Sequence, residues 1–306
     1  NDVIDVLAPK DGAIYVDATF GAGGYARALL EAADCAVWGI DRDPDAVAAG
    51  GVLASRYPGR LTILNGRFGE MRNLLAGVGV RQVDGIAIDL GVSSMQIDDP
   101  ARGFSFRADG PLDMRMAQAG PSAADIVNRM AEKELADIIY RYGEERASRK
   151  IARAIVELRD KTPIIRTGQL TELIRRVVRK SKDGIDPATR TFQALRIYVN
   201  EELAELDHGL ASTETLLGAG GRLAVVSFHS LEDRIVKAFF QSRSGAEPKP
   251  SRHRPMAVGE NSATPRFDVS EKRGRAPSTS EIAANPRARS ARLRWGIRTA
   301  APALAA

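Results

Sequence analysis

Short apolar runs alternate with longer stretches of helical periodicity over the first hundred residues of the chain. Four of these runs have the length and composition of β-strands, at residues 14–17, 36–41, 61–64 and 85–89. Strands that alternate with helices favour a parallel sheet covered by helices on both faces. This part of the chain therefore predicts an α/β fold.

The pattern changes to pure helical periodicity between about residues 122 and 210, where no strand is predicted. Apolar residues fall at helical spacing on three successive faces, and basic residues lie opposite the first two. The three apolar faces comprise Ala147, Ile151, Ile155 and Leu158; Leu170, Leu173, Ile174, Val177 and Val178; and Phe192, Leu195, Val199, Leu203 and Leu206.

Strand periodicity returns at residues 222–228, after a turn at Gly220-Gly221, and again at residues 291–299, which we expect to form an edge or hairpin strand. The intervening residues 242–261 are rich in Ser, Pro, Gly and Arg and predict a flexible loop. The simplest architecture is one sheet domain interrupted by an all-helical insertion. We place the sheet domain at residues 1–106 and 209–306 and the insertion at residues 107–208.

A glycine-rich segment between the first two predicted strands has the spacing of a nucleotide-cofactor site. Gly21, Gly23 and Gly24 follow the first strand directly, and glycine lets the backbone approach a bulky ligand. Asp41 closes the second strand 20 positions after Gly21, where an acid can accept hydrogen bonds from ribose hydroxyls. The spacing predicts a cofactor that contains adenosine.

Two cofactor classes fit this loop. Gly21, Gly23 and Ala26 satisfy the dinucleotide pattern G-x-G-x-x-A, so a nicotinamide cofactor is one alternative. Three features instead favour S-adenosylmethionine, which carries no phosphate. They are Asp17 at the end of the first strand, Asp89-Leu90-Gly91 at the end of the fourth, and the lack of a second glycine-rich phosphate loop.

The composition excludes several kinds of site and several classes of protein. The 306 residues contain one cysteine and three histidines, which excludes a disulfide framework and a multi-thiolate zinc site, and no metal is expected. No apolar run reaches membrane-spanning length, and acids stand at the start where a signal peptide needs basic residues. We therefore expect a cytoplasmic protein without a membrane partner.

The net charge of +5 is unevenly distributed. Residues 241–306 carry 13 Lys and Arg against 5 Asp and Glu, a local charge of 13 − 5 = +8, so residues 1–240 sum to 5 − 8 = −3. A basic flank of this kind indicates a surface that faces a polyanion. A disordered basic tail is the alternative.

Several long blocks of the sequence are similar to one family. The chain resembles the bacterial 16S rRNA cytosine-N4 methyltransferases between about Ile14 and Arg294, in the blocks ATFGAGG, GIDRDPDA, DGIAIDLGVSSMQIDDPARGFSFRADGPLDMRM, RYGEERASRKIARAIVE, PATRTFQALRIYVNEEL, GGRLAVVSFHSLEDRIVK and NPRARSARLR. The resemblance implies a class I, Rossmann-like methyltransferase sheet with a helical insertion. It further implies methylation of the exocyclic amine of one cytosine in the decoding region, with S-adenosylmethionine as donor.

The same resemblance assigns roles to individual residues. Tyr25 stands where the family has a histidine, and Met95 where a proline is common, so Tyr25 is expected to act through its backbone. The expected partner is 16S rRNA within the small ribosomal subunit, and a homodimer stays open. The implied cofactor-binding residues are Gly23, Gly24, Tyr25, Asp41, Phe68, Asp89 and Gln96.

The residue that accepts the proton of the target amine is not fixed by the sequence. Asp113 ranks slightly ahead of Asp109, Asp89 is expected to be occupied by the cofactor amino group, and His229 is a third catalytic candidate. His229 also fits a strand-end residue beside a capping box of Ser230 and Asp233. Cys35 is placed away from the site, which argues against methylation at carbon five through a cysteine nucleophile.

Contacts to RNA are expected from aromatic and basic side chains. Phe104 and Phe106 can hold an unstacked base, although anchoring their loop in the core is equally compatible with the sequence. The basic helix faces can contact phosphates or simply keep the surface soluble. The residues concerned are Arg149, Arg153, Arg175 and Arg179.

Three further functions stay open on the sequence. One is a class I methyltransferase acting on a small molecule or a protein, against which the basic flank argues. The others are a nicotinamide-dependent oxidoreductase and an RNA-binding scaffold without catalysis.

Overall fold

The computed structural model describes residues 2–179, 184, 186–245 and 264–303. The chain forms two compact units, one of Asn1–Gly91 with Ala204–Ala306 and the other of Val92–Leu203. The second unit begins 107 − 92 = 15 residues before the predicted insertion and ends 208 − 203 = 5 residues before its predicted end. Residues after Gly91 leave the sheet at once, whereas the predicted boundary assigned them to it.

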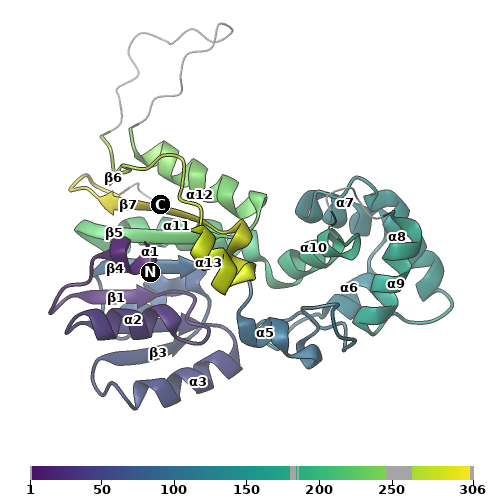
Figure 1. Cartoon of the computed structure of the whole chain (residues 1–306), viewed down its shortest axis with the longest axis horizontal. Coiled ribbons are helices and arrows are strands. Elements are labelled where there is room, and N and C mark those ends of the chain that lie inside the picture. The colour runs from purple at the N-terminus through teal and green to yellow at the C-terminus, as the bar shows by residue number, and fades with distance from the viewer. Residues whose placement is uncertain (1, 180–183, 185, 246–263, 304–306) are drawn as a thin grey trace, which may run out of the picture. The chain divides into compact units, whose positions relative to one another are not determined.

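Within the described residues, the first unit is built on a sheet of seven strands in the order β3-β2-β1-β4-β5-β7-β6 (Figure 1). Strands β1 to β5 are parallel, and β7 is antiparallel to both of its neighbours. This order with one reversed strand beside β5 is that of class I methyltransferases, and the predicted fold class is confirmed. The strands are β1 (Ile14–Asp17), β2 (Ala36–Asp41), β3 (Leu61–Asn65), β4 (Val83–Asp89), β5 (Leu217–Ser227), β6 (Phe267–Asp268) and β7 (Arg292–Arg298).

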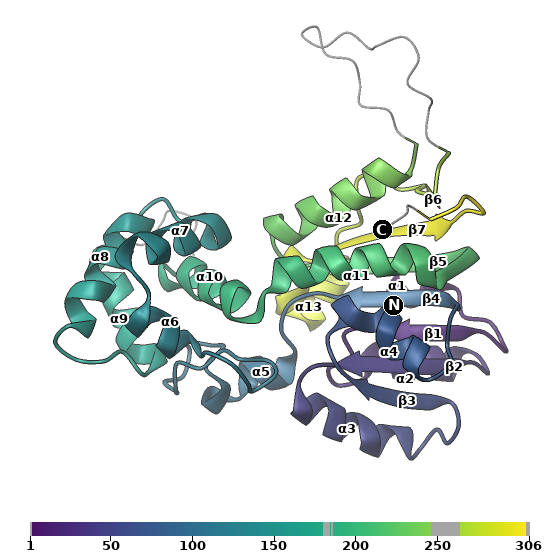
Figure 2. The same ribbon diagram turned by 180° about the vertical axis from the view of Figure 1, so that it is seen from behind.

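Apolar residues alternate along the strands, so the sheet has a core on each face. Val16, Ile40 and Ile86 face the core that contains α4, α11 and α12, whereas Tyr15 and Val37 face the core of α1 and α2. Figures 1 and 2 show these two helical layers from opposite sides. The helices are α1 (Asp2–Leu7), α2 (Gly24–Ala32), α3 (Pro44–Ala54), α4 (Met71–Gly77), α11 (Glu202–Leu216), α12 (Ser230–Arg243) and α13 (Thr279–Ala284), with 3₁₀ turns η1 (Phe68–Glu70) and η3 (Pro286–Ser290).

Two of the predicted strands differ in detail from the observed ones. The strand predicted at residues 222–228 begins at Leu217, and its register against β4 jumps between Leu217 and Arg222, where Gly220 has a φ of 85°. The segment at residues 291–299 is interior, because the short β6 pairs with β7 and takes the edge position. The two residues of β6 carry too little pattern to be predicted from the sequence.

The second unit is helical and has its own apolar core (Figure 2). The predicted face from Phe192 to Leu206 is divided between two helices, because Glu201 adopts a left-handed φ of 55° and ends α10. The helices of this unit are α5 (Ser94–Asp98), α6 (Ala123–Arg129), α7 (Glu132–Gly143), α8 (Ser148–Arg159), α9 (Thr167–Val177) and α10 (Ala188–Asn200), with the 3₁₀ turn η2 (Pro100–Arg102).

The flexible loop predicted at residues 242–261 lies mostly outside the described residues, since the description stops at residue 245 and resumes at 264. The helix α12 continues through Arg243, two residues into that predicted loop. Among the described residues, no helix combines the length and the apolar character needed to cross a membrane.

Candidate cofactor and acceptor site

The loop between β1 and α2 is seated on an aromatic ring. Phe20 is buried, and a Cβ on Gly23 would lie 2.6 Å from its Cζ. Gly23 also has a φ of 74° and caps α2, so glycine is required there by both packing and conformation. A Cβ on Gly24, by contrast, would meet no atom within 4 Å. The loop therefore offers an open backbone face at Gly24, where a ligand can approach.

Asp41 joins the glycine loop to the end of β2. Its Oδ2 accepts a hydrogen bond of 2.7 Å from the Gly21 N–H, and its Oδ1 accepts one of 2.8 Å from the Asp43 N–H. Burial raises the pKa of Asp41, while these two N–H groups oppose that rise. A carboxylate accepts up to about four hydrogen bonds, so capacity remains for ribose hydroxyls.

Two buried carboxyl groups lie at the carboxyl ends of β1 and β4. Burial raises the pKa of both Asp17 and Asp89 to about 7, and a neighbouring carboxylate adds to the rise in each case, Asp41 beside Asp17 and Asp17 beside Asp89. The Oδ2 of Asp17 accepts from the Ala26 N–H at 3.0 Å, and the Asp89 N–H donates to Thr19 Oγ1 at 2.7 Å. The Oδ1 atom of each acid is buried and has no hydrogen-bond partner within the described residues. This pair is suited to receive a cationic group.

The side chain of Tyr25 contacts Asp89. The hydroxyl hydrogen-bonds to Asp89, and burial raises the pKa of the phenol, so it stays protonated. Only a backbone contact is expected from the sequence. The hydroxyl contact was missed because the resemblance supplies a histidine at this position and no precedent for a tyrosine.

Phe68 is held against α11 by two features. A Cβ on Gly209 would lie 2.5 Å from Phe68 Cδ2, so the ring rests on a helix face without a side chain. Glu205 is buried and accepts hydrogen bonds from the backbone N–H groups of Phe68 and Gly69. Arg42 Nη1 donates to Glu205 Oε2 at 2.8 Å across 163 positions of sequence. A single glutamate in a helix gives no sequence signal for such a distant contact, so Glu205 was not predicted.

Gln96 and the two phenylalanines lie in the second unit. Gln96 is buried in a capping box, where its Oε1 accepts from the Ser93 N–H at 3.0 Å. Phe106 packs edge-on against Phe192 with ring centroids 4.9 Å apart, and Phe104 lies 5.7 Å from the Arg102 guanidinium. Both rings contact the core of this unit, as expected if they anchor their loop in it.

Asp113 and Asp109 each form an ion pair within the second unit. Partial burial acts to raise the pKa of Asp113, but the Arg115 guanidinium, 2.6 Å away, brings it below its usual value. The exposed Asp109 contacts Arg166 at 2.6 Å and accepts from the Gly168 N–H at 2.9 Å, and both contacts lower its pKa. Carboxylates held in this way are weak bases at neutral pH.

His229 is the N-cap of α12. Its Nδ1 accepts from the Glu232 N–H at 3.4 Å, and Glu232 Oε2 accepts from the His229 N–H at 3.3 Å. The capping box is therefore formed by His229 and Glu232, one residue earlier than the predicted Ser230 and Asp233. A capping box at the start of this helix was predicted correctly. Its position was predicted one residue too late, because histidine is an uncommon N-cap.

The predicted phosphate contacts lie on two helices of the second unit. Arg149 is exposed on α8, and Arg153 is 72% exposed with Glu132 at 3.8 Å. Arg175 forms an ion pair of 2.7 Å with Asp186, and Arg179 is exposed just past the end of α9. Lys180 and Lys182, which extend this basic cluster in the sequence, lie outside the described residues.

The family profile and the similar sequences agree on one family. The profile of the MraW methylase family matches residues 1–299. A protein from Rhodospirillum centenum named "Ribosomal RNA small subunit methyltransferase H" is 64% identical over 99% of this chain and 92% of its own length. A protein of the same name from Paramagnetospirillum magneticum is 60% identical over 99% and 95%. The solved structure of an rRNA methylase from Streptococcus thermophilus aligns with a TM-score of 0.37 and 12% identity, over 97% of this chain and 92% of that one.

Proposed function

The chain belongs to the MraW methylase family, and on this premise we propose that it methylates N4 of one cytosine in the decoding region of 16S rRNA. The donor is S-adenosylmethionine, and the transfer is direct and in line. The observation that carries the proposal is the full-length match to relatives named for methylation of small-subunit rRNA. The target atom rests on the sequence blocks that resemble the cytosine-N4 enzymes.

The residues of the first unit fit the donor. S-adenosylmethionine supplies, when bound, a methyl group on a positively charged sulfur. Asp41 would hold the ribose hydroxyls, Phe68 the adenine, and the open backbone at Gly23 and Gly24 the methionine part. The unpartnered oxygen atoms of Asp17 and Asp89 suit its ammonium group. Buried carboxylates without a cation are unfavourable, so binding of a cation there relieves a cost already present in the fold.

The chemistry asks little of the protein beyond alignment and charge stabilisation. A bond forms between N4 of cytosine and the methyl carbon, the carbon–sulfur bond breaks, and N4 gives up one proton. Asp113, Asp109 and His229 are our candidates for stabilising the amine as it loses that proton. Asp113 and Asp109 are each already paired with an arginine, and His229 already caps α12.

We assign recognition of the substrate to the helical unit. Phe104 and Phe106 would stack on the extruded base, and Arg149, Arg153, Arg175 and Arg179 would contact phosphates. Cys35 is buried, and its Sγ donates to the Leu29 carbonyl oxygen at 3.5 Å. A thiol placed in this way supports nitrogen over ring carbon as the methyl acceptor.

The deciding experiment is transfer of labelled methyl groups to small ribosomal subunits purified from cells that lack this protein. We expect one labelled N4-methylcytidine in the decoding region of 16S rRNA. Label at another nucleoside would leave methyl transfer standing and refute the assigned atom. If no label is incorporated although S-adenosylmethionine binds normally, the small ribosomal subunit is refuted as the substrate.

A further inference from the structure

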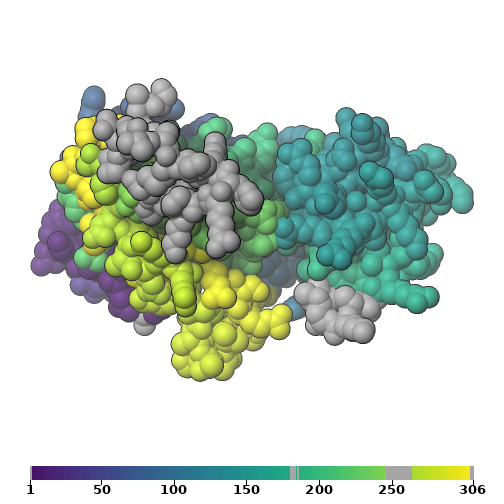
Figure 3. All heavy atoms as spheres, turned by 90° about the horizontal axis from the view of Figure 1, so that it is seen from above, coloured from purple at the N-terminus to yellow at the C-terminus, as the bar shows by residue number. Residues whose placement is uncertain are grey.

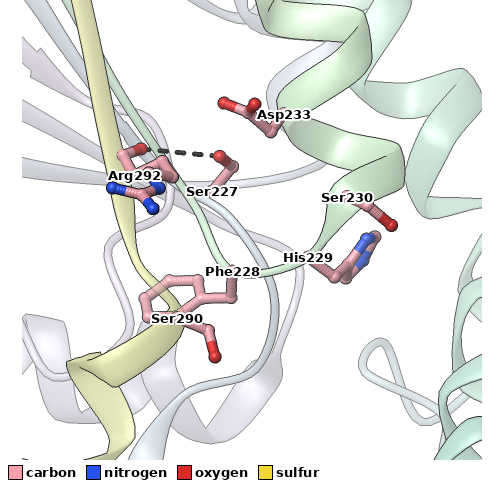
Figure 4. Close-up of a pocket in the computed structure, with 7 residues that line it drawn as sticks. All are labelled: Ser227, Phe228, His229, Ser230, Asp233, Ser290 and Arg292. Carbon is pink, nitrogen blue, oxygen red and sulfur yellow. Dashed lines mark hydrogen bonds between the residues drawn. The ribbon is translucent and has the colours of Figure 1, made fainter. Parts of the chain in front are cut away.

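A pocket of about 370 Å³ opens where β5 ends and α12 begins (Figure 4). Its volume is in the range of small ligand sites. Two segments far apart in the sequence line it, one between β5 and α12 and the other between η3 and β7. The lining residues are Ser227, Phe228, His229, Ser230, Asp233, Ser290 and Arg292.

The lining is mainly polar and rich in hydrogen-bond donors. It contains three hydroxyl groups, from Ser227, Ser230 and Ser290, together with the guanidinium of Arg292. Ser227 is buried and its Oγ donates to the Arg292 carbonyl oxygen at 3.4 Å, which ties the two segments together (Figure 4). Arg292 itself is exposed, and among the residues that the structure describes its guanidinium has no carboxylate partner. An arginine in this state is available to an anion.

Asp233, the one carboxylate among the lining residues, is already neutralised. Asp233 accepts two hydrogen bonds from Arg294, of 2.7 and 3.0 Å, and Arg294 is buried. Glu232 is turned toward the backbone, where it accepts from the N–H groups of Phe228 and His229. Because Asp233 is paired, Arg292 carries the charge in the lining that no described carboxylate balances.

The pocket lies on the side of the sheet where the acceptor is expected. Ligands of parallel α/β sheets bind at the carboxyl ends of the strands, and Phe228 and Gly91 follow the carboxyl ends of β5 and β4. A Cβ on Gly91 would lie 3.8 Å from the Phe228 ring, so the two strand ends are neighbours. Residues α13 to β7 belong to the basic flank, and Figure 3 shows part of that flank (lime to yellow) standing out from the surface of the first unit.

We propose that this pocket holds one phosphate group of the rRNA strand. The Arg292 guanidinium would bind the phosphate through two parallel N–H donors. The contact fixes the RNA backbone next to the site of methyl transfer. The proposal rests on the proposed function in taking RNA as the polyanion.

The test compares Arg292→Ala with Arg81→Ala. Arg81 is an exposed arginine that precedes β4 at the opposite, amino-terminal edge of the sheet, so both variants lose one surface charge. Binding of a single-stranded RNA with the decoding-region sequence is measured by fluorescence anisotropy at several salt concentrations. For Arg292→Ala we expect about tenfold weaker binding and a slope of log K against log salt that is shallower by about 0.7, the value for one phosphate contact on a single strand. Arg81→Ala should match the wild type.

A second pair of variants guards against a general effect on the fold. Ser290→Asp leaves Arg292 in place but puts a carboxylate on an exposed position of the lining, and it should weaken RNA binding at least as much. Arg292→Lys keeps the charge without the planar fork and should fall between wild type and Arg292→Ala. Affinity for S-adenosylmethionine and the melting temperature should stay unchanged in all of them.

The outcomes separate this proposal from the proposed function. If wild-type protein methylates small subunits but Arg292→Ala and Ser290→Asp bind RNA like Arg81→Ala, the phosphate site is refuted and the function stands. If wild-type protein does not methylate small subunits, the function is refuted, and RNA binding by the variants still decides the pocket. Inorganic phosphate that binds while RNA affinity is unaffected in all variants would show an adventitious anion site and overturn the proposal.

Discussion

Asp17 and Asp89 show how a site can be prepared for a cation before the cation arrives. Burial, with a smaller contribution from a neighbouring carboxylate, raises the pKa of each carboxyl group to about 7. The Ala26 and Thr19 N–H groups donate to Asp17 and the Tyr25 hydroxyl donates to Asp89, but one oxygen of each acid has no partner within the described residues. The protein thus tolerates a local cost to stability at the place where we propose that the ammonium group of the donor binds.

This cost predicts a dependence of stability on pH. The pKa of Asp17 is about 7 in the folded protein against 3.8 for an ordinary aspartate, so between these values the folded state binds the extra proton. The contribution of Asp17 to the free energy of unfolding therefore falls as pH rises from about 4 to 7 and stays low above pH 7. Asp17→Asn, which cannot ionise, should be more stable than wild type at pH 8 and equal to it near pH 4 in urea unfolding. A difference that does not change with pH would contradict the assignment.

We predict that Asp41 contributes more to the binding of S-adenosylmethionine than to the stability of the fold. Asp41→Ala removes the acceptor of the Gly21 and Asp43 N–H groups and of the ribose hydroxyls. Calorimetric titration with S-adenosylmethionine should show a loss of about 1.5 to 3 kcal/mol, the worth of charge-assisted hydrogen bonds. Asp41→Asn keeps one acceptor for the loop and should lose less. Unchanged affinity in Asp41→Ala would remove this residue from the cofactor site.

At the scale of elements, Phe20 sets the position of the glycine loop above the sheet. A Cβ on Gly39 in β2 would lie 2.5 Å from Phe20 Cδ2 and 2.9 Å from Ile63 Cδ1, and one on Gly50 in α3 would lie 2.8 Å from Phe20 Cε1. The ring thus fills a space bounded by glycines on a strand and a helix. Packing of this ring, together with the hydrogen bond to Asp41, holds the loop in place before any ligand binds.

Alanine at two of the glycines should have opposite effects. Gly39→Ala should destabilise the protein by about 1 to 3 kcal/mol, because the interior is overpacked. Gly24→Ala meets no atom and should leave the free energy of unfolding unchanged or slightly higher, while weakening binding of S-adenosylmethionine. Chemical denaturation and calorimetry of the two variants check this. A destabilised Gly24→Ala with normal donor affinity would contradict the open face at Gly24.

The cap of α12 offers a direct test of the role of His229. Asparagine is a good N-cap, so His229→Asn should keep the melting temperature, whereas His229→Ala should cost about 1 kcal/mol. If His229 only caps the helix, methyl transfer by His229→Asn equals that of wild type. A loss of turnover in His229→Asn at normal stability, with a changed pH profile, would instead identify the imidazole as a base.

Elements with a strong local pattern were predictable from the sequence. The parallel strands and the faces of α8 and α9 show periodicity over many residues, and the spacing of the glycine loop and Asp41 correctly places them at the ends of β1 and β2, where the Gly21 N–H donates to Asp41. The break at Glu201 was not predictable, because it depends on a tertiary contact: the buried Asn200 side chain bonds to the Met114 carbonyl and the Met116 N–H. The apolar pattern runs on past residue 201, whereas the helix does not.

At the scale of the whole molecule, the chain is one domain interrupted by another. Residues Val92–Leu203 contain a core of their own in which Leu135, Ile151 and Leu195 are fully buried. Their length of 203 − 92 + 1 = 112 residues is that of an ordinary domain. The ion pairs of Asp109 and Asp113 in this unit, and the burial of Asp17 in the other, could not be derived from spacing, because they depend on the assembled fold.

This organisation predicts that the helical unit folds alone. A fragment of residues 92–203 should show helical circular dichroism and a cooperative thermal transition, because its core closes without the sheet. It should bind RNA and leave S-adenosylmethionine unbound. A fragment of identical length shifted to residues 40–151, which cuts both units, serves as control and should be unfolded. A non-cooperative transition of the 92–203 fragment would contradict the independence of its core.

The strand order has a consequence for biosynthesis. A nascent chain completes β1 to β4 and then the entire helical unit before β5 is translated, although β4 and β5 are neighbours. Throughout that interval the apolar edge of β4 stands without its partner, at risk of pairing with another chain. The helical unit is translated completely during that interval and can therefore fold before the sheet is complete. Chaperone dependence should therefore peak while residues 92–216 emerge, and ribosome profiling of chaperone-bound nascent chains would locate that window.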